Sequence, residues 1–542
     1  MTDTKPTSAQ PKTLLEIAGY LSNLIKSFDL SEVDVNHSSI TVAQISLDSR
    51  AIQSTDLFIA LQGQQSHGLD FLESVLQKLP GLVISDRALT TKEQTLLDGH
   101  NQLHNQSVKV WVVVDIEHEL GNFAAWFYDN PSQKLKVVGI TGTNGKTSTA
   151  FFTGQLLKEL GNKVALIGTL GNGEIDNLQQ TSNTTPNSVQ VQRLLNEFVE
   201  QDMNWIVMEV SSHALCLGRI QGVTFQTVAL TQVTRDHIDF HGSVEAYSEA
   251  KSRLFTDYKI QNMVLNLDDA LGGKLCHDKQ QKNRSEIVWC YSVESIEQIR
   301  SKSSRTLANL SCENVQLTAQ GISFNPVFSH KLSTEDSESI NLALMGLFNL
   351  ENVLCTMSIL LVNGFSWQAI KSKLRLLQSV AGRMQVLGKS PTIILDFAHT
   401  PDALEQVLTA VKSHLVDGKG ELKVVFGCGG NRDQGKRPLM GEIAQSLADE
   451  VILTSDNPRD ESPEQIIKEI ATGLSQSNSV ESLVDRKQAI IQVLDHASQQ
   501  DIIVIAGKGH EDYQEIAGVK HPFSDAQVVQ DWLAIKESEK HG

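Results

Sequence analysis

The chain has 542 residues, and at roughly 150 residues per domain this length predicts three or four domains. Its 46 Lys and Arg against 64 Asp and Glu give a formal net charge of −18 (46 − 64). That balance argues against a general nucleic-acid binder, because such proteins neutralise phosphates with an excess of basic side chains. The hydrophobic fraction of 40% is ordinary for a globular protein with large cores.

The cysteines and the N-terminal residues indicate in which cellular compartment the protein is found. None of the six cysteines forms a CxxC pair, which argues against a zinc ribbon or a redox dithiol and fits a reducing environment. The polar start MTDTKPTSAQPK lacks the apolar core of a secretory signal, and no run of about 18 apolar residues predicts a membrane span. We therefore expect a cytoplasmic protein without membrane insertion.

The N-terminal part is predicted to begin with a flexible tail over residues 1–12, followed by a helix with one apolar face. That face would consist of Leu14, Ala18, Leu21 and Ile25. Short strands follow to about residue 114. The polar stretch 98–107 is expected to be a loop, and the apolar run 110–116 is expected to be a strand.

The middle of the chain alternates apolar strands with helices. The predicted strands are 136–140, 204–210, 225–231 and 262–269. Near-continuous apolar runs of this kind are typical of a parallel sheet covered on both faces. A helix after residue 145 should stop at Gly161, and the more polar region 295–340 predicts an irregular insertion or a small antiparallel unit.

A second α/β series begins after 381–387. Its apolar strands, each ending in a polar or glycine-rich tip, are 392–400, 422–430, 450–458 and 501–511. In open α/β sheets, ligands bind beyond the carboxyl ends of the strands. The four tips therefore predict a substrate-binding crevice.

The strongest local signal is the glycine-rich run 139–147, which lies between a predicted strand and a predicted helix. This is the context of a phosphate-binding P-loop, whose backbone amides and helix N-terminus hold phosphates. The phosphate-binding residues would be Gly142, Thr143, Asn144, Gly145, Lys146 and Thr147. Lys146 would reach the β- and γ-phosphates, and the Thr147 hydroxyl would bind Mg²⁺. Ile140 departs from the GxxxxGK[ST] spacing; the alternative is a glycine-rich turn that binds nothing.

Further motifs accompany the loop TGTNGKT. They are MEVSSHAL (208–215), TRDHIDFHG (234–242), AGRMQ (381–385), FGCGGNRDQGKRP (426–438), DNPR (456–459) and GKGHEDYQ (507–514). With these motifs the chain resembles the Mur ligases from about residue 46 to 525, and among them those that add meso-diaminopimelate. The resemblance implies an α/β fold of three domains: a smaller N-terminal domain for the UDP end (1–114), a central P-loop ATPase-like domain with a mainly parallel sheet (115–380), and a C-terminal Rossmann-like domain (381–542).

The resemblance also implies the reaction. Such a ligase joins meso-diaminopimelate to the D-Glu side-chain carboxylate of UDP-N-acetylmuramoyl-L-Ala-D-Glu, with ATP converted to ADP and phosphate, in peptidoglycan biosynthesis. ATP turns the poorly electrophilic carboxylate into an acyl phosphate, which the amine then attacks. Because two anions must be held together, the site needs cations more than a strong base. The expected partners are these small molecules alone, bound by a monomer.

Three residues outside the loop are candidates for metal chemistry. The resemblance assigns Glu209 and His237, with Thr147, to Mg²⁺; taken alone, they could be a strand-end salt-bridge partner and a satisfied loop histidine. Lys251 lies on a predicted helix and could simply be a solvated lysine paired with Glu245 or another acid. The resemblance makes it a carbamate (N6-carboxylysine) that holds a second Mg²⁺, which requires a buried lysine with a lowered pKa.

The resemblance assigns further residues to three binding sites. The UDP-substrate would contact Ser49, Gly68, Thr184, Thr185, Ser211 and Arg219. ATP would also contact Asn349, Asn352, Arg383 and Asp396. The incoming amino acid would contact Arg432, Asp456, Asn457, Arg459, Gly507 and Glu511. Helix capping is the alternative role for the two asparagines near residue 350.

The segment DNPR bears on which amino acid is added. Meso-diaminopimelate differs from L-lysine by a far carboxylate, which the planar fork of Arg459 can bind, while Glu511 can pair with the far ammonium. Alternatively, Arg459 pairs with Asp460 or Glu461 at the surface.

Three other functions are alternatives for this sequence. DNPR argues against an L-lysine-adding ligase, and the N-terminal LDSR with MEVSSHAL argues against a folylpolyglutamate synthase. A non-catalytic, nucleotide-gated binding protein would not retain Glu209, His237 and Lys251 together.

Overall fold

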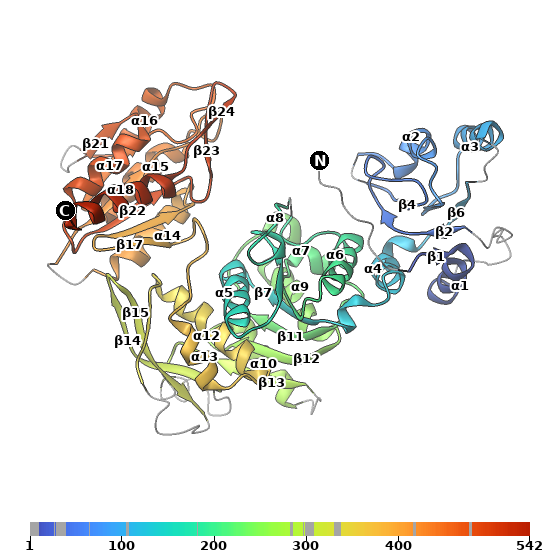
Figure 1. Ribbon diagram of the computed structural model, residues 1–542, viewed down its shortest axis with the longest axis horizontal. Coiled ribbons are helices and arrows are strands. Elements are labelled where there is room, and N and C mark those ends of the chain that lie inside the picture. The colour runs from blue at the N-terminus through green and yellow to red at the C-terminus, as the bar shows by residue number, and fades with distance from the viewer. Residues whose placement is uncertain are drawn as a thin grey trace. The chain divides into compact units, whose positions relative to one another are not determined.

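The structure is a computed structural model, shown in Figure 1. It describes residues 10–26, 28, 40–63, 65–104, 108–181, 183–281, 286–295, 298, 308–329, 338–415, 419–475 and 480–541. Most of the predicted N-terminal tail lies outside these residues. Contacts within the chain group into two compact units, and each is described by itself. The first comprises Met1–Ala150, Leu157–Leu265 and Asp269–Val288, and the second comprises Phe151–Leu156, Asn266–Asp268 and Trp289–Gly542.

The N-terminal part of the first unit is a four-stranded parallel sheet with helices packed against it. The strands, in sheet order, are β3 (Ile45–Ser46), β4 (Leu57–Ala60), β5 (Leu82–Ser85) and β6 (Val110–Val112). The helices are α1 (Leu14–Leu24), η2 (Gly68–Phe71), α2 (Leu72–Leu76), α3 (Thr91–His104) and α4 (Ile116–Phe127). A short pair, β1 (Lys12–Thr13) with β2 (Thr41–Val42), precedes the sheet. Helix α1 confirms the predicted amphipathic helix, because Leu14, Ala18 and Leu21 are fully buried.

Two predictions in this part were wrong. The stretch 98–107, expected to be a loop, is helical in α3 as far as His104; residues 105–107 lie outside the description. Thr90 and Glu93 exchange hydrogen bonds at the start of α3, and Leu97 is buried, so the polar composition reflects an exposed helix face. The strand expected over 110–116 ends at Val112, and α4 begins at Ile116.

The rest of the first unit is built on a mainly parallel sheet. Its strands run in the order β12 (Ile260–Asn266), β11 (Phe225–Leu230), β7 (Lys136–Thr141), β10 (Trp205–Glu209), β8 (Val164–Gly168) and β9 (Gly171–Glu174), with only β9 antiparallel to its neighbour. The accompanying helices are η3 (Pro131–Gln133), α5 (Lys146–Glu159), α6 (Ser188–Glu200), α7 (Ser212–Cys216), α8 (Ile238–His241), α9 (Val244–Thr256) and α10 (Ala270–Gln281). The four predicted strands and the end of α5 before Gly161 are thus confirmed.

The register of this sheet brings chemistry-bearing residues to one edge. Glu209 is paired with Ile140, and Leu230 with Thr141. The carboxyl ends of β7, β10 and β11 therefore lie side by side, at the edge where parallel sheets bind ligands.

The second unit starts with an antiparallel meander. Strands β14 (Leu310–Thr318), β15 (Gly321–Phe328) and β16 (Ile340–Leu342) pair in sequence, so the described part of region 295–340 confirms the small antiparallel unit. Strand β13 (Ile287–Tyr291) pairs with β14 through Tyr291. Helices α12 (Leu347–Val362) and α13 (Trp367–Leu374) follow.

The C-terminal part of the second unit is a Rossmann-like sheet covered on both faces. Its order is β17 (Gln385–Lys389), β18 (Thr392–Asp396), β22 (Ile502–Ala506), β19 (Leu422–Phe426), β20 (Glu450–Thr454) and β21 (Val480–Leu483), with only β17 antiparallel. The helices are α14 (Pro401–Lys412), α15 (Lys436–Leu447), α16 (Pro463–Ala471), α17 (Arg486–His496) and α18 (Asp525–His541). A hairpin, β23 (Tyr513–Ile516) with β24 (Val519–Pro522), precedes α18.

Alternating residues of these strands enter two separate cores. Ile394 and Val424 pack with α14, α15 and α16, whereas Ile393 and Val425 pack with α17 and α18. A sheet buried on both faces explains the continuous apolar runs of the sequence. Among the described helices, none is long and apolar enough to cross a membrane.

Candidate functional site

The glycine-rich loop connects β7 to α5 and has the backbone of a phosphate cradle. Gly142 adopts φ 154° and Gly145 adopts φ 84°. A Cβ at residue 142 would lie 2.0 Å from Thr231 Oγ1, so only glycine fits there. Ile140 is fully buried within β7 and so belongs to the strand rather than to the loop.

The Lys146 side chain curls back over this loop. Its Nζ donates to the carbonyl oxygens of Gly142 at 3.0 Å and Thr143 at 2.9 Å. The ammonium is therefore held at the mouth of the cradle, where β- and γ-phosphate oxygens would replace the two carbonyls as acceptors.

Glu209 is buried at the tip of β10, beside the start of α5. Its Oε2 accepts from Thr147 Oγ1 at 2.8 Å, and its Oε1 accepts from the Thr169 amide at 2.8 Å. The side chain is 2% exposed. The structure therefore places the carboxylate of Glu209 against the Thr147 hydroxyl, two hard oxygen donors of the kind that Mg²⁺ prefers.

His237 lies at the tip that follows β11. It adopts a left-handed backbone (φ 50°) directly before α8. Its ring is half exposed, 3.4 Å from Asp236 and 4.8 Å between centroids from His213. Among the described residues, no group of three or more His, Cys, Asp or Glu is arranged to hold a metal ion. The metal role of His237 stays a prediction.

Lys251 lies on α9 as predicted, but it is buried rather than solvated. Only 1% of the residue is exposed, and its Nζ donates to Gly142 O at 2.7 Å and lies 4.5 Å from the Tyr247 ring centroid. Burial, and secondarily the charge of Lys146, lowers the pKa of Lys251 to about 6. The alternative of a solvated pair with Glu245 is wrong, and the neutral amine that carbamate formation requires is present at pH 7.

Four residues that are predicted to bind the UDP-substrate lie around the backbone of Glu209 and its neighbours. Thr185 Oγ1 donates to Glu209 O at 2.9 Å and accepts from the Ser211 amide at 3.1 Å. Arg219 Nη1 donates to Thr185 O at 3.1 Å, and Thr184 Oγ1 lies 3.0 Å from Thr169 Oγ1. The structure thus gathers the four into one cluster.

The two remaining UDP-substrate candidates lie on the N-terminal sheet. Ser49 O accepts from Lys78 Nζ at 3.2 Å. A Cβ on Gly68 would lie 2.6 Å from Ala60 Cα, so glycine allows η2 to approach β4. His67, directly before η2, is buried, with Nε2 2.6 Å from Asp86 Oδ1 and Nδ1 accepting from the Leu69 amide.

The predicted adenine and ribose contacts lie in the second unit. Asn349 and Asn352 are buried on α12, and Asn349 Nδ2 donates to Met345 O at 2.8 Å. The helix is capped by Gly346, so helix capping by the asparagines is wrong. Asp396 accepts from the amides of Met384 and Ala398, both at 2.8 Å, and burial raises the pKa of its carboxyl.

The third ATP candidate of this unit, Arg383, is exposed beside Gly382. Its guanidinium is therefore accessible to an anionic ligand.

The tips of β20 and β22 carry an ordered polar network. Asn457 Nδ2 donates to Glu511 Oε2 at 2.8 Å, and Lys508 Nζ donates to Asn457 Oδ1 at 3.0 Å. Asp456 is 8% exposed, and its Oδ2 has no hydrogen-bond partner among the described residues. A Cβ on Gly507 would lie 2.5 Å from that oxygen. The structure thus brings four predicted amino-acid contacts together; Arg432 is exposed on a neighbouring loop.

Arg459 pairs with neither of the acids next to it in sequence. Its Nε donates to Glu515 Oε2 at 3.1 Å, whereas Asp460 accepts from Asn431 and Glu461 pairs with Arg437. The alternative of a surface pair with Asp460 or Glu461 is therefore wrong.

Three residues of this site were missed by the sequence analysis. Lys508 is fully buried between the two glycines of GKG, and Arg437 is fully buried against Glu461 and Glu469. Glu515 follows directly after GKGHEDYQ. The available signal was their position within or beside the motifs. Lys508 pairs with Glu511 in the same motif, whereas the partners of Arg437 and Glu515 lie far away in the sequence.

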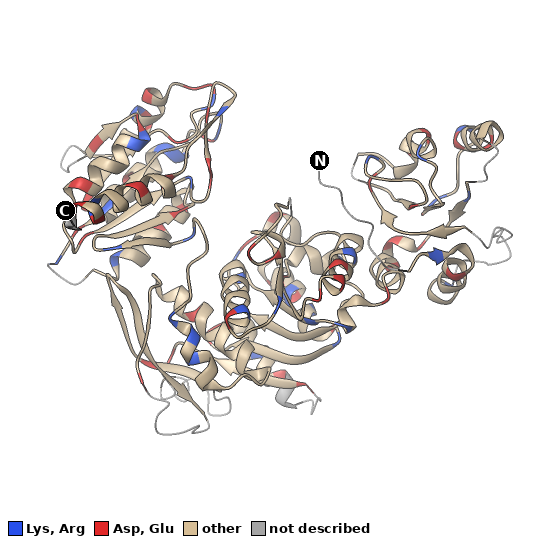
Figure 2. Cartoon of the chain, viewed as in Figure 1, with Lys and Arg blue, Asp and Glu red and all other residues tan. Residues whose placement is uncertain are grey.

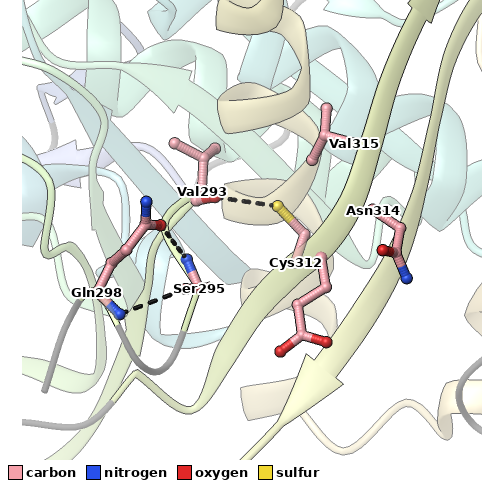
Figure 3. A pocket seen from close by; sticks show the side chains of 7 residues that line it. Val293, Ser295, Gln298, Cys312, Asn314 and Val315 are labelled. Atoms are coloured by element: carbon pink, nitrogen blue, oxygen red, sulfur yellow. Dashed lines mark hydrogen bonds between the residues drawn. The ribbon is translucent and has the colours of Figure 1, made fainter.

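Two wider features concern the distribution of charge and a surface hollow. Acidic and basic residues are interspersed over the helices, as Figure 2 shows. Figure 3 shows a hollow lined by Val293, Ser295, Gln298, Cys312, Glu313, Asn314 and Val315, none of them a predicted site residue. There Cys312 Sγ donates to Val293 O at 3.3 Å, and burial raises the pKa of its thiol to about 12, so it is no thiolate nucleophile at neutral pH.

Comparison with known proteins extends these observations. One family model, Mur ligase middle domain, matches residues 140–360, and another, Mur ligase, glutamate ligase domain, matches 382–509. A UDP-N-acetylmuramoyl-L-alanyl-D-glutamate–2,6-diaminopimelate ligase of Coxiella burnetii is 39% identical over 90% of this chain and 95% of its own. One of the same name from Pseudomonas putida is 38% identical over 92% and 96%.

Solved structures agree with the sequence relatives. A structure titled with the same ligase name has a TM-score of 0.71 and 33% identity, and the match covers 97% of this chain and 100% of that one. A UDP-N-acetylmuramoylalanyl-D-glutamyl-2,6-diaminopimelate–D-alanyl-D-alanyl ligase from Acinetobacter baumannii shares the fold, with a TM-score of 0.59 at 16% identity over 98% of this chain and 100% of its own.

Proposed function

The chain belongs to the Mur ligase family, and from this premise we propose that it adds meso-diaminopimelate to UDP-N-acetylmuramoyl-L-Ala-D-Glu. It has the three-domain α/β architecture of that family and is an ATP-dependent ligase of peptidoglycan synthesis. We place the domain limits near residues 114 and 380. The reaction is assigned to the cytoplasm, where ATP is available, and to a monomer.

One observation carries the phosphate chemistry: the glycine-rich loop, with Lys146 at its mouth, lies against the buried Lys251, whose Nζ donates to Gly142 O at 2.7 Å. In the first step an oxygen of the D-Glu carboxylate attacks the γ-phosphorus, and ADP leaves. In the second the amine attacks the acyl carbon, phosphate leaves and the amine loses a proton. Lys146 and the loop amides hold the phosphate oxygens in both steps.

The residues around Glu209 are suited to a divalent cation. Its buried carboxylate accepts hydrogen bonds from a neutral hydroxyl and an amide. A cation that replaced the hydrogen bond from Thr147 would be bound by two oxygens, the Thr147 hydroxyl and the Glu209 carboxylate. Thr147, Glu209, His237 and a carbamate on Lys251 would hold Mg²⁺. When bound, Mg²⁺ neutralises charge on the phosphates and the carboxylate. The carbamate would supply oxygens where the unmodified amine has none.

The amino-acid preference rests on the C-terminal network. Arg459 presents a cationic fork for the far carboxylate, which L-lysine lacks. Arg432, Asp456, Asn457, Gly507 and Glu511 complete the proposed site. Lys508 Nζ donates a hydrogen bond to Glu511 Oε2 at 3.3 Å. We propose that the other carboxylate oxygen, Oε1, accepts a hydrogen bond from the far ammonium of the amino acid.

The deciding experiment is a phosphate-release assay with each substrate omitted in turn. We expect release only when ATP, the UDP-muramoyl-dipeptide and meso-diaminopimelate are all present, and far less with L-lysine. Equal use of L-lysine would overturn the amino-acid assignment. Nucleotide binding without any release would favour a nucleotide-gated binding protein instead.

A further inference from the structure

The hairpin β23–β24 is joined to the loop that carries Arg459. The Arg459 amide donates to Glu515 O at 3.0 Å, and the Ala517 amide donates to Arg459 O at 2.7 Å. Glu515 is also tied to the neighbouring site residue, because its amide donates to Asn457 Oδ1 at 2.9 Å. The backbones of residues 459 and 515 are therefore fixed relative to each other.

The Arg459 guanidinium is held at two of its three nitrogens. Nε donates to Glu515 Oε2 at 3.1 Å, and Nη1 donates to Gly430 O at 2.9 Å. For Nη2, no partner is found within the described part of the chain. The pair is partly accessible, with side-chain exposures of 22% for Arg459 and 25% for Glu515. A ligand can therefore reach the group while the protein holds its orientation.

Gly430, the second anchor, is itself held in place. Its amide donates to Asn457 O at 2.9 Å, and the preceding carbonyl, Gly429 O, accepts from the buried Arg437 at 3.3 Å. The guanidinium is thus clamped between a rigid loop on one side and the Glu515 carboxylate on the other.

We propose that Glu515 is a positioning residue for amino-acid selection: it orients the Arg459 guanidinium so that Nη2 receives the far carboxylate of the incoming amino acid. This inference rests on the proposed function. A long arginine side chain loses rotational freedom on binding a ligand, and a chain already held by Glu515 loses less. The opposite possibility, that Glu515 competes with the ligand carboxylate for Arg459, predicts a change of opposite sign.

The test is steady-state kinetics of the full-length enzyme with Glu515→Ala and Glu515→Gln. Alanine removes the acceptor, whereas the glutamine amide oxygen can still accept from Nε. We expect Glu515→Ala to raise the KM for meso-diaminopimelate roughly three- to tenfold and to leave the KM values for ATP and the UDP-substrate unchanged. Glu515→Gln should restore most of the affinity. Glu442→Ala, at an exposed position on α15, is the matched control.

A second arm measures coupling. In an Arg459→Ala background, Glu515→Ala should cause no further rise in that KM, because its effect passes through the guanidinium. A lowered or unchanged KM for Glu515→Ala would overturn the inference, as would a glutamine variant as impaired as alanine or KM values raised for all three substrates. Failure of the wild-type enzyme to use meso-diaminopimelate would instead overturn the proposed function.

Discussion

The proposed role of Lys146 in catalysis depends on its charge, and its side chain contributes little to the packing of the fold. Its ammonium contacts the carbonyls of its own loop, so Lys146→Ala should leave the fold intact. Loss of one electrostatic donor to a transferred phosphoryl group typically lowers the rate ~10²–10³-fold. We expect a loss of phosphate release on that scale with an unchanged thermal unfolding midpoint. Near-normal turnover of a folded variant would contradict the P-loop assignment.

Lys251 permits a test of the carbamate. The pKa of its amine is lowered to about 6, chiefly by burial, so the unmodified residue is mostly uncharged at pH 7 and can react with CO₂. Lys251→Ala should be nearly inactive, and added short carboxylic acids such as acetate should partly restore turnover by replacing the missing oxygens. Mass spectrometry or a high-resolution map of active enzyme with an unmodified amine would rule the carbamate out.

Arg459 gives a prediction about specificity. Arg459→Ala removes the group proposed to bind the far carboxylate, and for a partly buried charge pair the loss is about 2 kcal/mol or more, roughly thirtyfold in affinity. The KM for meso-diaminopimelate should rise while those for ATP and the UDP-substrate stay near wild type. If the variant kept its preference over L-lysine, the selectivity would reside elsewhere.

At the scale of single residues, motifs predicted where chemistry lies but not how side chains pair. Arg459 and Glu515 are 56 positions apart, and Asn457 and Glu511 are 54 apart. No local pattern links such partners, because the pairing is created by the sheet order β22–β19–β20 and by the hairpin β23–β24 that follows β22. The burial of Lys251 was likewise invisible in a helix segment that reads as mixed polar and apolar.

Among the structural elements, the turn at Gly382 permits a stability prediction. Gly382 adopts φ 68°, and a Cβ there would lie 2.4 Å from the His510 amide nitrogen. Gly382→Ala should cost more than the ~1–2 kcal/mol of a left-handed alanine, because the GKGH turn must also move. Gly364→Ala (φ 86°, with nothing within 4 Å) is the matched control. Urea unfolding should show the larger loss at residue 382; equal losses would exclude the steric contribution.

Elements with continuous apolar runs were predictable, whereas the polar helix α3 was not. The strands of both parallel sheets follow from runs such as 136–140 and 392–396, since burial on both faces demands them. Helix α3 was mistaken for a loop because its exposed face is polar and its burial depends on few residues such as Leu97. The order in which the strands pair within each sheet could not be predicted from these runs and is known only from the structure.

For the molecule as a whole, His414 predicts a pH dependence of stability. It is fully buried, accepts from the Gly346 amide through Nε2 at 2.7 Å and donates to Thr318 O through Nδ1 at 2.8 Å. Both bonds require a neutral ring, and burial lowers the pKa of His414.

The sign of the effect follows from proton linkage. In the unfolded chain His414 has a pKa near 6.5, so below that pH the unfolded chain binds a proton that the folded chain does not. As the pH is lowered from there to the folded pKa, the free energy of unfolding should therefore decrease. Urea unfolding at pH 7.5 and 5.5 should show this loss. The loss should be smaller in His414→Gln, and an identical loss in that variant would assign the effect to other groups.

The Asp456 Oδ2 atom, which has no hydrogen-bond partner in the described parts of the chain, has a consequence for how this protein can change over time. A buried acceptor without a donor weakens the free domain by about 1–3 kcal/mol, and a ligand that supplies the donor strengthens the occupied domain by a similar amount. Variants in which another side chain of the protein donates a hydrogen bond to this oxygen would be more stable but would bind the amino acid less tightly. On the proposed binding role of Asp456, selection for stability and selection for recognition of the amino acid act on this position in opposite directions.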